Sequence, residues 1–447
     1  MPSPLGNPPG PIGWPLLGML PQFRANPAEF LLRTSQEYGD IVYFRLGLQK
    51  VFFLNRPDLI EEVLVSIQGN FTKSRMLQRA KTLLGEGLLT SEGPLHLRQR
   101  RLVQPAFSRE RLASYAQTMV SCADRAQGRW TDGESLDVAG EMMRLTLAVV
   151  GLTLFSRDTE GDAADIGSAM TALLATYGTL LLPFGNLIRM LPAGPVRRAK
   201  SAQKLLDAKV YEIIRERRAE GSDRGDLLSM LLLASESNGD SMDDRQVRDE
   251  AMTLILAGHE TTATALTWTW YLLSQHPEVE TRLHAEWQDV LGGRLPEFAD
   301  LPNLVYTDRV IAESLRLYPP AWALGRMAIR EFRLYNHIIP ARAICLMSPY
   351  AMHRNPRFWP APQRFDPDRF APENRASRPK FAYFPFGGGA RVCIGERFAQ
   401  MEAVLLLASI GQRWRFRLEP GQRVDIHPQI TLRPRYGMRM TGGRVVA

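Results

Sequence analysis

Apolar residues recur every three to four positions along most of the chain, which is the spacing that predicts amphipathic helices. Five long stretches carry this pattern: residues 110–130, 140–155, 199–219, 244–275 and 277–291. Four short runs instead alternate or cluster apolar residues as strands do: residues 41–47, 50–55, 331–340 and 342–350. Many helices with a small, separate strand region predict a mainly α, α+β fold and argue against alternating β-α-β units.

The helix predicted over residues 244–275 has an unusual centre. About 30 residues make a rod of about 45 Å, long enough to cross a whole domain. Gly258 lies near its middle and weakens it by about 1 kcal/mol relative to alanine. Glu260 and Thr261 then place an acid and a hydroxyl beside that glycine in an otherwise apolar helix. Taken alone, Thr261 and Thr262 could simply donate hydrogen bonds to the carbonyls of their own helix.

A glycine-rich loop surrounds one of the three cysteines. Three glycines, residues 387–389, precede Cys393, and an apolar helix pattern begins just after it. Free loop amides and the positive end of a helix stabilise a thiolate, which is a soft ligand suited to iron. Gly395 leaves room for a flat ligand, and Arg391 is placed to reach an anion on it. The loop does not complete a dinucleotide-binding fingerprint, because Val392 replaces the last glycine, and it has no Walker lysine.

Composition places the chain among ordinary globular proteins. Its 447 residues are 45% hydrophobic and 23% charged, which is enough to bury a large core. No linker composition interrupts it, so we expect a single domain over residues 1–447, with a Pro-rich N-terminal segment at residues 1–15. The other two cysteines, Cys122 and Cys345, are far apart in sequence, so neither a disulfide framework nor a zinc site is expected.

Charge and targeting signals narrow the range of binding partners and cellular compartments expected for the protein. The formal net charge is +8, but the arginines are scattered and no nucleic-acid-binding motif accompanies them, so no nucleic acid is expected. The N-terminus has no signal-peptide pattern. The uncharged stretch 166–188 is interrupted by polar residues, and it predicts a buried or ligand-lining helix rather than a transmembrane anchor. We expect a monomer in the reducing cytoplasm.

The cysteine loop resembles a known signature. The sequence FGGGARVCIG, residues 386–395, fills every specified position of F-x-x-G-x-R-x-C-x-G, the haem-binding signature of the cytochrome P450 superfamily. The resemblance extends from about Pro8 to the end of the chain. It implies the cytochrome P450 fold, with a large helical part and a smaller β-rich part. It implies that Cys393 ligates the iron of haem b as a thiolate, with Phe386 and Gly395 beside the cofactor.

The long helix resembles the family's oxygen-activation motif. The sequence AGHETT, residues 257–262, matches [AG]-G-x-[DE]-T-[TS]. The resemblance implies that Ala257 and Gly258 border the haem, and that Glu260 and Thr261 are catalytic. In this role they deliver protons while O2 is activated.

Two further groups of residues match the family. Glu313 and Arg316 resemble its E-x-x-R pair, and Arg369 matches the arginine that completes the buried ionic cluster, although Asp368 replaces the usual glutamate. Apolar neighbours favour burial of this cluster over an exposed pair, and we assign it to folding. The resemblance implies that four residues bind the haem propionates: His96, Arg100, Arg326 and Arg391.

The substrate pocket is inferred by analogy with the family, although each residue on its own is more often plain core. The predicted lining residues are Leu88, Leu89, Leu256, Ala257, Ala321, Trp322, Ala323, Ile430 and Thr431. An apolar pocket suits a lipophilic small molecule. The implied reaction is insertion of one oxygen atom of O2 into a C–H bond of that molecule.

Electrons must come from another protein, since the chain has no flavin or nicotinamide fingerprint. We expect a ferredoxin or flavodoxin with its reductase, so that NAD(P)H acts indirectly. Arg98, Arg101 and Arg397 would attract such an acidic partner, or would simply be solvated. Two alternatives stay open: a peroxide-driven peroxygenase or isomerase on the same fold, and a non-enzymatic haem-thiolate sensor or electron carrier.

Overall fold

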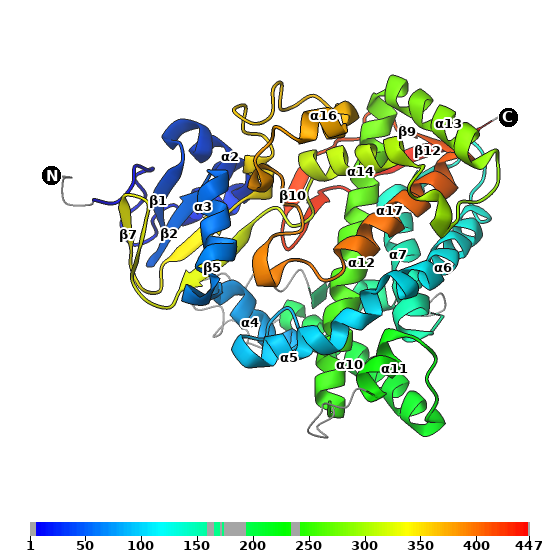
Figure 1. Ribbon diagram of the computed structural model, residues 1–447, viewed down its shortest axis with the longest axis horizontal. Helices are drawn as coiled ribbons and strands as arrows, with labels where there is room; N and C mark the ends of the chain where they lie inside the picture. The colour runs from blue at the N-terminus through cyan, green and yellow to red at the C-terminus, as the bar shows by residue number, and fades with distance from the viewer. Residues whose placement is uncertain (1–5, 159–164, 170–171, 174–193, 234–241, 446–447) are drawn as a thin grey trace. The chain divides into compact units, whose positions relative to one another are not determined.

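The computed structural model describes residues 6–158, 165–169, 172–173, 194–233 and 242–445 (Figure 1). The chain forms two compact units, each built from several segments. Unit 1 comprises Met1–Gln78, Ala312–Cys393 and Ile426–Arg433. Unit 2 comprises Arg79–Ile311, Ile394–Asp425 and Pro434–Ala447.

Unit 1 is built on a five-stranded sheet of order β1-β2-β8-β5-β3. Its strands are β1 (Ile41–Leu46), β2 (Gln49–Leu54), β3 (Phe71–Lys73), β5 (Leu324–Ala328) and β8 (Ile344–Met347). β1 and β2 confirm the two strand-like runs predicted at residues 41–47 and 50–55, and they pair as an antiparallel hairpin that turns at Gly47 with φ 61°. β8 pairs in parallel with β2, which joins two segments almost 300 residues apart. The predicted run 331–340 forms a separate hairpin of β6 (Phe332–Leu334) and β7 (His337–Ile339).

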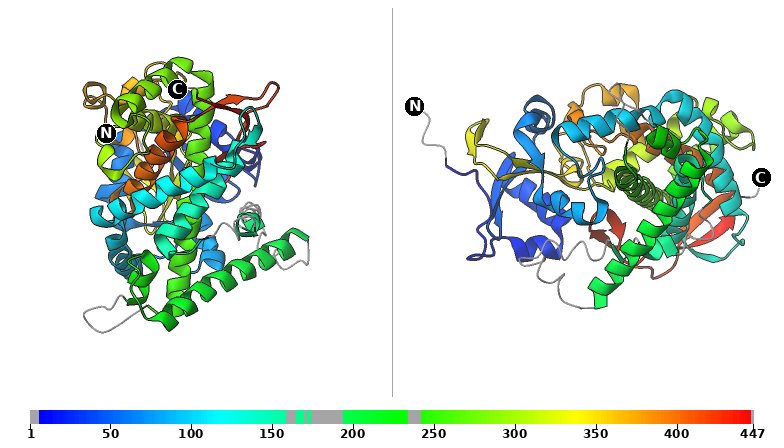
Figure 2. Two further views of the ribbon diagram at one scale, coloured as in Figure 1. Left: turned by 90° about the vertical axis from the view of Figure 1, so that its right-hand side faces the viewer. Right: turned by 90° about the horizontal axis from the view of Figure 1, so that it is seen from below.

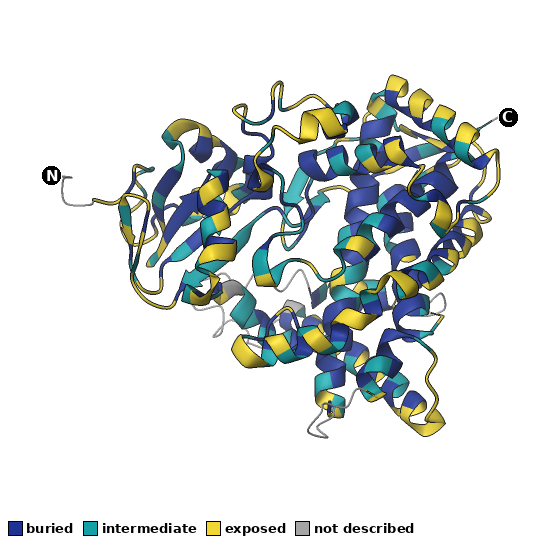
Figure 3. Cartoon of the chain, viewed as in Figure 1, coloured by how far each residue is buried: buried dark blue, intermediate teal, exposed yellow. Residues whose placement is uncertain are grey.

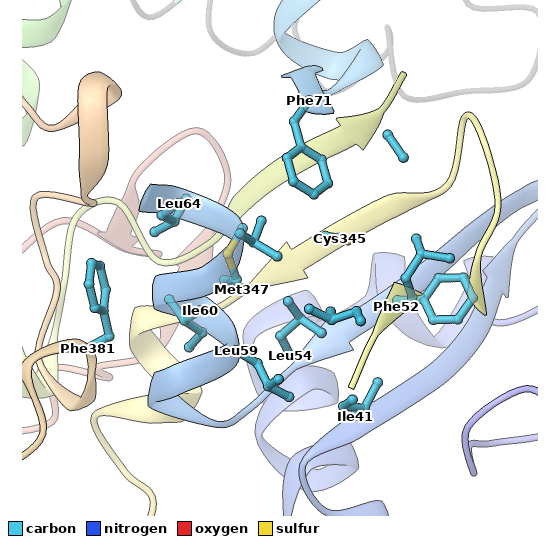
Figure 4. Packing of buried hydrophobic residues seen from close by; sticks show 14 of the residues in the cluster. Ile41, Phe52, Leu54, Leu59, Ile60, Leu64, Phe71, Cys345, Met347 and Phe381 are labelled. Atoms are coloured by element: carbon cyan, nitrogen blue, oxygen red, sulfur yellow. The ribbon is translucent and has the colours of Figure 1, made fainter. Parts of the chain in front are cut away.

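Apolar clusters cover both faces of this sheet. Alternate side chains of β2 point to opposite sides, so they enter different clusters. Phe52 and Leu54 pack with Ile60 of α3 (Pro57–Glu61) and with Cys345 of β8 (Figure 4). Phe53 belongs to a second cluster that contains buried residues of α2 (Pro27–Tyr38). Burial raises the pKa of Cys345 to about 12, so this thiol stays neutral and serves as a core side chain.

Helices dominate unit 2. In the part of this unit that the structure describes, the helices with defined bounds that lie wholly within it are α5 (Gly93–Val103), α6 (Arg109–Gln127), α7 (Val138–Phe155), α10 (Gly194–Glu220), α11 (Leu227–Leu233), α12 (Asp244–Gln275), α13 (Pro277–Leu291) and α17 (Glu396–Gly411). They confirm the five predicted helical stretches, although α6 ends three residues early. α4 (Arg75–Leu84) and α14 (Val305–Leu317) contain residues of both units.

The remaining short elements are strands, one-turn helices and 3-10 or π turns that the periodicity did not predict. The strands are β4 (Ser135–Asp137), β9 (Trp414–Leu418) and β12 (Arg439–Arg444), which form one sheet, and β10 (Ile426–Pro428) and β11 (Leu432–Pro434), which form another. The helices and turns are α1 (Leu20–Ala25), α15 (Pro349–Met352), α16 (Pro372–Arg375), η1 (Glu62–Ser66), η2 (Gln68–Asn70), η3 (Gln104–Phe107), η5 (Phe298–Asp300), η6 (Pro367–Phe370), η7 (Lys380–Ala382) and η8 (Gly389–Arg391).

α12 is the central helix of unit 2 and confirms the prediction over residues 244–275. The Asp243 carboxylate caps it by accepting the Gln246 N–H at 2.7 Å. α7, α10 and α17 pack against it (Figure 2), and most of its residues are buried (Figure 3). The burial is interrupted at residues 255–258 and at Thr261, which marks one less covered patch near the middle of the helix.

One helix in the described ranges, α7, is long and apolar enough to cross a membrane by length and composition. Its mean hydropathy is 1.5, and 72% of it is buried inside the protein, as is usual for a core helix. The uncharged stretch 166–188, predicted to be a buried or ligand-lining helix, lies mostly outside the described residues.

Candidate active site

The Cys393 loop closes on itself through three backbone hydrogen bonds. The Cys393 N–H donates to the Phe386 carbonyl at 3.0 Å, the Gly387 N–H to Phe384 at 3.0 Å, and the Val392 N–H to Gly389 at 3.1 Å. The loop therefore has a defined conformation despite its glycines. Cys393 is exposed, whereas Cys122 and Cys345 are buried, so Cys393 alone presents its thiol at a surface. Gly395, which follows it, is half-buried and caps the start of α17.

Gly389 is required by both backbone and packing. Its φ is 69°, a left-handed conformation that residues with a β-carbon rarely adopt. A β-carbon there would lie 1.8 Å from the Leu64 carbonyl oxygen. The next amide, that of Ala390, donates to Gln68 Oε1 at 3.0 Å. The predicted tight turn is therefore also a close contact with η1 and η2, which sequence patterns could not show.

His353 is a residue of this site that the sequence analysis missed. Its ring is fully buried, and Nε2 accepts the Phe384 N–H at 3.0 Å, at the entrance of the cysteine loop. Burial, aided by the nearby Arg316 and Arg354, holds the pKa of His353 well below its usual value. The imidazole is thus neutral and keeps Nε2 as a hydrogen-bond acceptor. A lone histidine in a loop carries no recognisable sequence signal.

The E-x-x-R residues form a buried ionic cluster in unit 1. Arg316 binds Glu313 with two hydrogen bonds, Nε to Oε2 at 2.6 Å and Nη2 to Oε1 at 2.7 Å, and both side chains are fully buried. Arg369 Nε lies 3.4 Å from Glu313 Oε1. Arg316 Nη1 also donates to the His353 carbonyl at 2.8 Å. The cluster is therefore connected through His353 to the loop that carries Cys393.

The four predicted propionate ligands lie in both units, two in each. In unit 1, Arg326 is a half-buried residue of β5, and Arg391 is a half-buried residue of η8, two positions before Cys393. Phe386, of the same loop, is half-buried as well. In unit 2, His96 and Arg100 lie one turn apart on α5, the first buried and the second half-buried.

The centre of α12 presents polar groups beside a bare backbone. The Thr261 hydroxyl donates to the Ala257 carbonyl at 2.7 Å, and that of Thr262 to Gly258 at 3.3 Å. The back-bonding weighed from the sequence is therefore present. Glu260 is buried, with 2% of its surface exposed, whereas Ala257 is exposed and Thr261 half-buried.

Gly258 lets another helix approach α12. A β-carbon on it would lie 3.0 Å from Val150 Cγ2 of α7. One residue further on, the His259 carbonyl accepts the Thr146 hydroxyl of α7 at 2.9 Å. α7 therefore supports the middle of α12 where its propensity is weakest.

Glu402 is a second residue that the sequence analysis missed. It lies on α17, is fully buried, and faces α12. Burial raises the pKa of Glu402 to about 8, although the neighbouring Thr262 hydroxyl acts in the opposite direction. A signal existed: Glu402 is the one charge within an apolar run, residues 401–410.

The predicted substrate-pocket residues differ in exposure. In unit 2, Leu88 is buried at 8% exposure, Leu89 is exposed at 37%, Leu256 is half-buried and Ala257 exposed. In unit 1, Ala321, Ala323 and Ile430 are half-buried and Thr431 is buried.

Trp322 differs from the other predicted pocket residues, because it belongs to a core cluster of unit 1. Its indole N–H donates to the Gln429 carbonyl at 2.9 Å. This bond ties the segment around residue 322 to the segment that carries Ile430 and Thr431.

The donor set present fits a haem with a thiolate ligand. Unit 1 combines an exposed thiol with two half-buried arginines, and unit 2 carries a histidine and an arginine on one helix face. These groups match one iron ligand and two anionic propionates. Within the described residues, no group of three or more His, Cys, Asp and Glu side chains could hold a metal ion by themselves.

Fold and donors together define a haem-thiolate protein, and the sequence comparisons identify its family. The profile of the cytochrome P450 family matches residues 8–439, so the chain belongs to the cytochrome P450 family. It is 41% identical to cyclooctatin synthase of Streptomyces melanosporofaciens, over 94% of this chain and 92% of that protein. It is 40% identical to cyclooctat-9-en-7-ol 5-monooxygenase of the same organism, over 93% and 90%.

Two further comparisons agree. Pentalenene oxygenase of Streptomyces avermitilis is 35% identical over 95% of this chain and 93% of its own length. The structure of retinoic acid bound cyanobacterial CYP120A1 superposes with a TM-score of 0.89, covering 99% of this chain and 100% of that one at 26% identity. The predicted mainly α, P450-type fold is confirmed.

Family membership establishes the general activity. The protein is a haem-thiolate monooxygenase, an oxidoreductase that uses haem and O2 and acts on a lipophilic small molecule. Its reducing equivalents come from a redox partner.

Proposed function

We propose that this enzyme hydroxylates a cyclic terpene hydrocarbon or alcohol. The observation that carries the proposal is the 40–41% identity, over more than nine-tenths of the chain, to two enzymes named for cyclooctatin and cyclooctat-9-en-7-ol. The predicted pocket residues support it, because they include no charged side chain and a single hydroxyl, that of Thr431. Such a lining suits a rigid hydrocarbon skeleton.

The residues that would hold haem follow from the donor set. We assign the iron ligand to Cys393 and the propionates to His96, Arg100, Arg326 and Arg391. Phe386, Gly395, Ala257 and Gly258 would border the ring. When bound, haem with a thiolate ligand supplies the chemistry that cleaves the O–O bond. Glu313, Arg316 and Arg369 stay outside the chemistry and stabilise unit 1.

Glu260 and Thr261 handle protons in this proposal. The Thr261 hydroxyl, which donates to the Ala257 carbonyl at 2.7 Å, keeps lone pairs on Oγ1 that can accept a hydrogen bond from a water molecule. The Glu260 carboxyl, on the preceding residue, would give its proton to that water, which would pass one of its own protons on to the site, and the carboxylate would be reprotonated from solvent. In this proposal the Thr261 hydroxyl holds the proton donor in place by hydrogen bonding, and Glu260 controls the supply of protons from solvent.

The electron donor is proposed to be a ferredoxin or flavodoxin served by an NAD(P)H-dependent reductase. Both are acidic proteins as a class, and Arg98, Arg101 and Arg397 would attract them. Arg397 and Arg109 line a pocket of about 270 Å³ with an apolar wall that includes Met401. This pocket can receive an apolar side chain of the partner. We further propose that the chain acts as one haem domain, as a cytoplasmic monomer without a transmembrane anchor, and apart from nucleic acid.

The test uses the purified, haem-loaded protein with a surrogate ferredoxin and ferredoxin reductase. Pentalenene, cyclooctat-9-en-7-ol and palmitic acid would be supplied separately with NADPH and O2. We expect products heavier by one oxygen atom from at least one terpene and none from the linear acid. Oxidation of palmitic acid alone would refute the terpene assignment, and absence of any product with an intact CO spectrum would favour a sensor.

A further inference from the structure

The loop that connects α4 to α5, residues 85–91, is held against α12 by buried charges. The Glu86 N–H donates to Asp249 Oδ2 at 2.8 Å, and the Leu88 N–H donates to Glu250 Oε2 at 2.9 Å. Asp249 and Glu250 are only 5% and 0% exposed. Buried carboxylates are costly unless they are hydrogen-bonded or paired. Here each of them satisfies a loop amide.

The two glycines of the loop allow it to lie directly on α12. A β-carbon at Gly85, whose φ is 66°, would overlap the Asp249 carboxyl group at 2.0 Å. At Gly87 it would lie 2.3 Å from Thr253 Oγ1 and 2.4 Å from the Asp249 carbonyl oxygen. At these two positions the loop therefore lies against α12 with no side chain of its own in between, and its backbone meets the Asp249 side chain and the Thr253 hydroxyl directly.

Arg248 extends this contact to two other helices. Its Nη1 binds Asp249 Oδ1 at 2.9 Å, and its Nη2 donates to the Leu83 carbonyl, at the end of α4, at 3.1 Å. Its Nε binds Asp207 of α10 at 2.9 Å. Arg248 as a whole is 6% exposed. One buried arginine therefore joins α10, α12 and the beginning of the loop.

The conformation so held decides which leucine the loop presents. Leu88 is buried at 8% exposure, and Leu89 is exposed at 37%. The hydrogen bond from the Leu88 amide to Glu250 fixes the backbone between these two leucines and α12.

We propose that Arg248, Asp249 and Glu250 are positioning residues that set ligand specificity by fixing the 85–91 loop, and that Asp207 makes its position depend on α10. The specificity part rests on the proposed function, in which Leu88 and Leu89 belong to the substrate pocket. The part that concerns loop position does not depend on it.

Three isosteric variants of the holoenzyme test the proposal: Asp207→Asn, Asp249→Asn and Glu250→Gln. Asp244→Asn is the matched control, because Asp244 also joins α12 to α10, through Arg218 at 2.6 Å, but on the exposed surface. Two quantities would be measured for each variant: amide hydrogen exchange of residues 85–91 and the midpoint temperature of thermal unfolding. Loss of one charged acceptor should speed exchange of the loop about tenfold more than it speeds exchange of amides that open only on global unfolding.

Specificity would be measured with two nitrogen ligands of the haem iron, imidazole and 4-phenylimidazole, in optical titrations. The three variants should change the Kd of 4-phenylimidazole by up to about tenfold and leave that of imidazole unchanged. The control should match the parent enzyme in both assays.

The outcomes separate the two proposals. Unchanged loop exchange in the variants would overturn the proposal that the charges position the loop. Faster exchange with an unchanged ratio of the two Kd values would overturn the specificity role. A parent enzyme that binds no haem would instead refute the proposed function.

Discussion

Thr261 makes a structural hydrogen bond with the same hydroxyl to which we assign a chemical role in the proposed function. Its hydrogen bond to Ala257 is the ordinary one for a threonine inside a helix. It lies in the less covered part of α12, next to the buried Glu260, and this position is the reason for the proposed chemical role. The two roles are separable by mutation, because loss of the back-bond costs little stability.

We predict that Thr261→Ala separates electron use from product formation. Without the hydroxyl, protons are no longer positioned, so NADPH and O2 consumption should continue while product falls at least about tenfold and hydrogen peroxide accumulates. The measurement is the ratio of product to NADPH, with Thr269→Ala, a buried back-bonding threonine further along α12, as the control. An unchanged ratio would point to the peroxide-driven or isomerase alternative.

Glu402 should make stability depend on pH. Its folded-state pKa, about 8, lies above the ordinary value of 4.5. The folded state therefore holds a proton that the unfolded state has lost, and the stabilising contribution disappears as the pH rises from 4.5 through 8.

We predict that Glu402→Gln removes this pH dependence. The parent free energy of unfolding should fall by on the order of 4 kcal/mol over that interval, whereas that of the variant stays flatter. Denaturant unfolding at pH 5 and pH 8.5 measures it, with the exposed Glu373→Gln as control. Parallel curves for parent and Glu402→Gln would contradict the assignment.

The cysteine loop is the element whose shape depends most on contacts distant in sequence. η1 approaches Gly389, and His353 binds its entrance through Phe384. The loop is therefore held from two sides, although its glycines would make its backbone flexible in isolation.

We predict that Gly389→Ala weakens haem binding. The added methyl would overlap the Leu64 carbonyl oxygen at 1.8 Å, and an alanine would disfavour the left-handed φ of 69°. The loop must therefore shift and carry Cys393 with it. Gly421→Ala is a control for backbone strain alone, since Gly421 has φ 79° and nothing within 4 Å. Haem content and the CO difference spectrum provide the measurement. Equal losses in the two variants would show that packing against Leu64 is unimportant.

The two units are stabilised by different sets of interactions. Unit 1 surrounds its sheet with two apolar clusters and adds the buried Glu313–Arg316 pair, whereas unit 2 is organised around α12. A buried ion pair is sensitive to loss of one partner, because the other charge remains without compensation.

We predict that Glu313→Gln destabilises the fold by about 3 kcal/mol or more, because Arg316 and Arg369 lose their shared carboxylate. Asp124→Asn is the control: its bond to Arg413 at 2.6 Å is exposed and should be worth less than about 1 kcal/mol. Thermal unfolding followed by far-ultraviolet circular dichroism measures both. A loss in Glu313→Gln no greater than in the control would contradict a folding role for the cluster.

Local sequence patterns determined a large part of this protein. Periodicity predicted the long helices and the strands β1 and β2, but not their pairing, since helical and strand spacing are properties of a short segment. The glycine loop, the AGHETT run and the E-x-x-R pair could be recognised because their residues are close in sequence. Short strands such as β4 and β9 were missed, because pairing between distant segments decides them and three to five residues carry too little pattern.

Only the tertiary structure decided what depends on distant neighbours. It showed that Gly389 meets Leu64, that His353 and Glu402 are buried with altered pKa values, and that Asp249 and Glu250 hold the loop carrying Leu89. Burial, dielectric environment and backbone approach arise when segments far apart in the chain come together. No local pattern encodes these properties. The candidate chemical groups could therefore be recognised in the sequence, whereas their surroundings were known only from the fold.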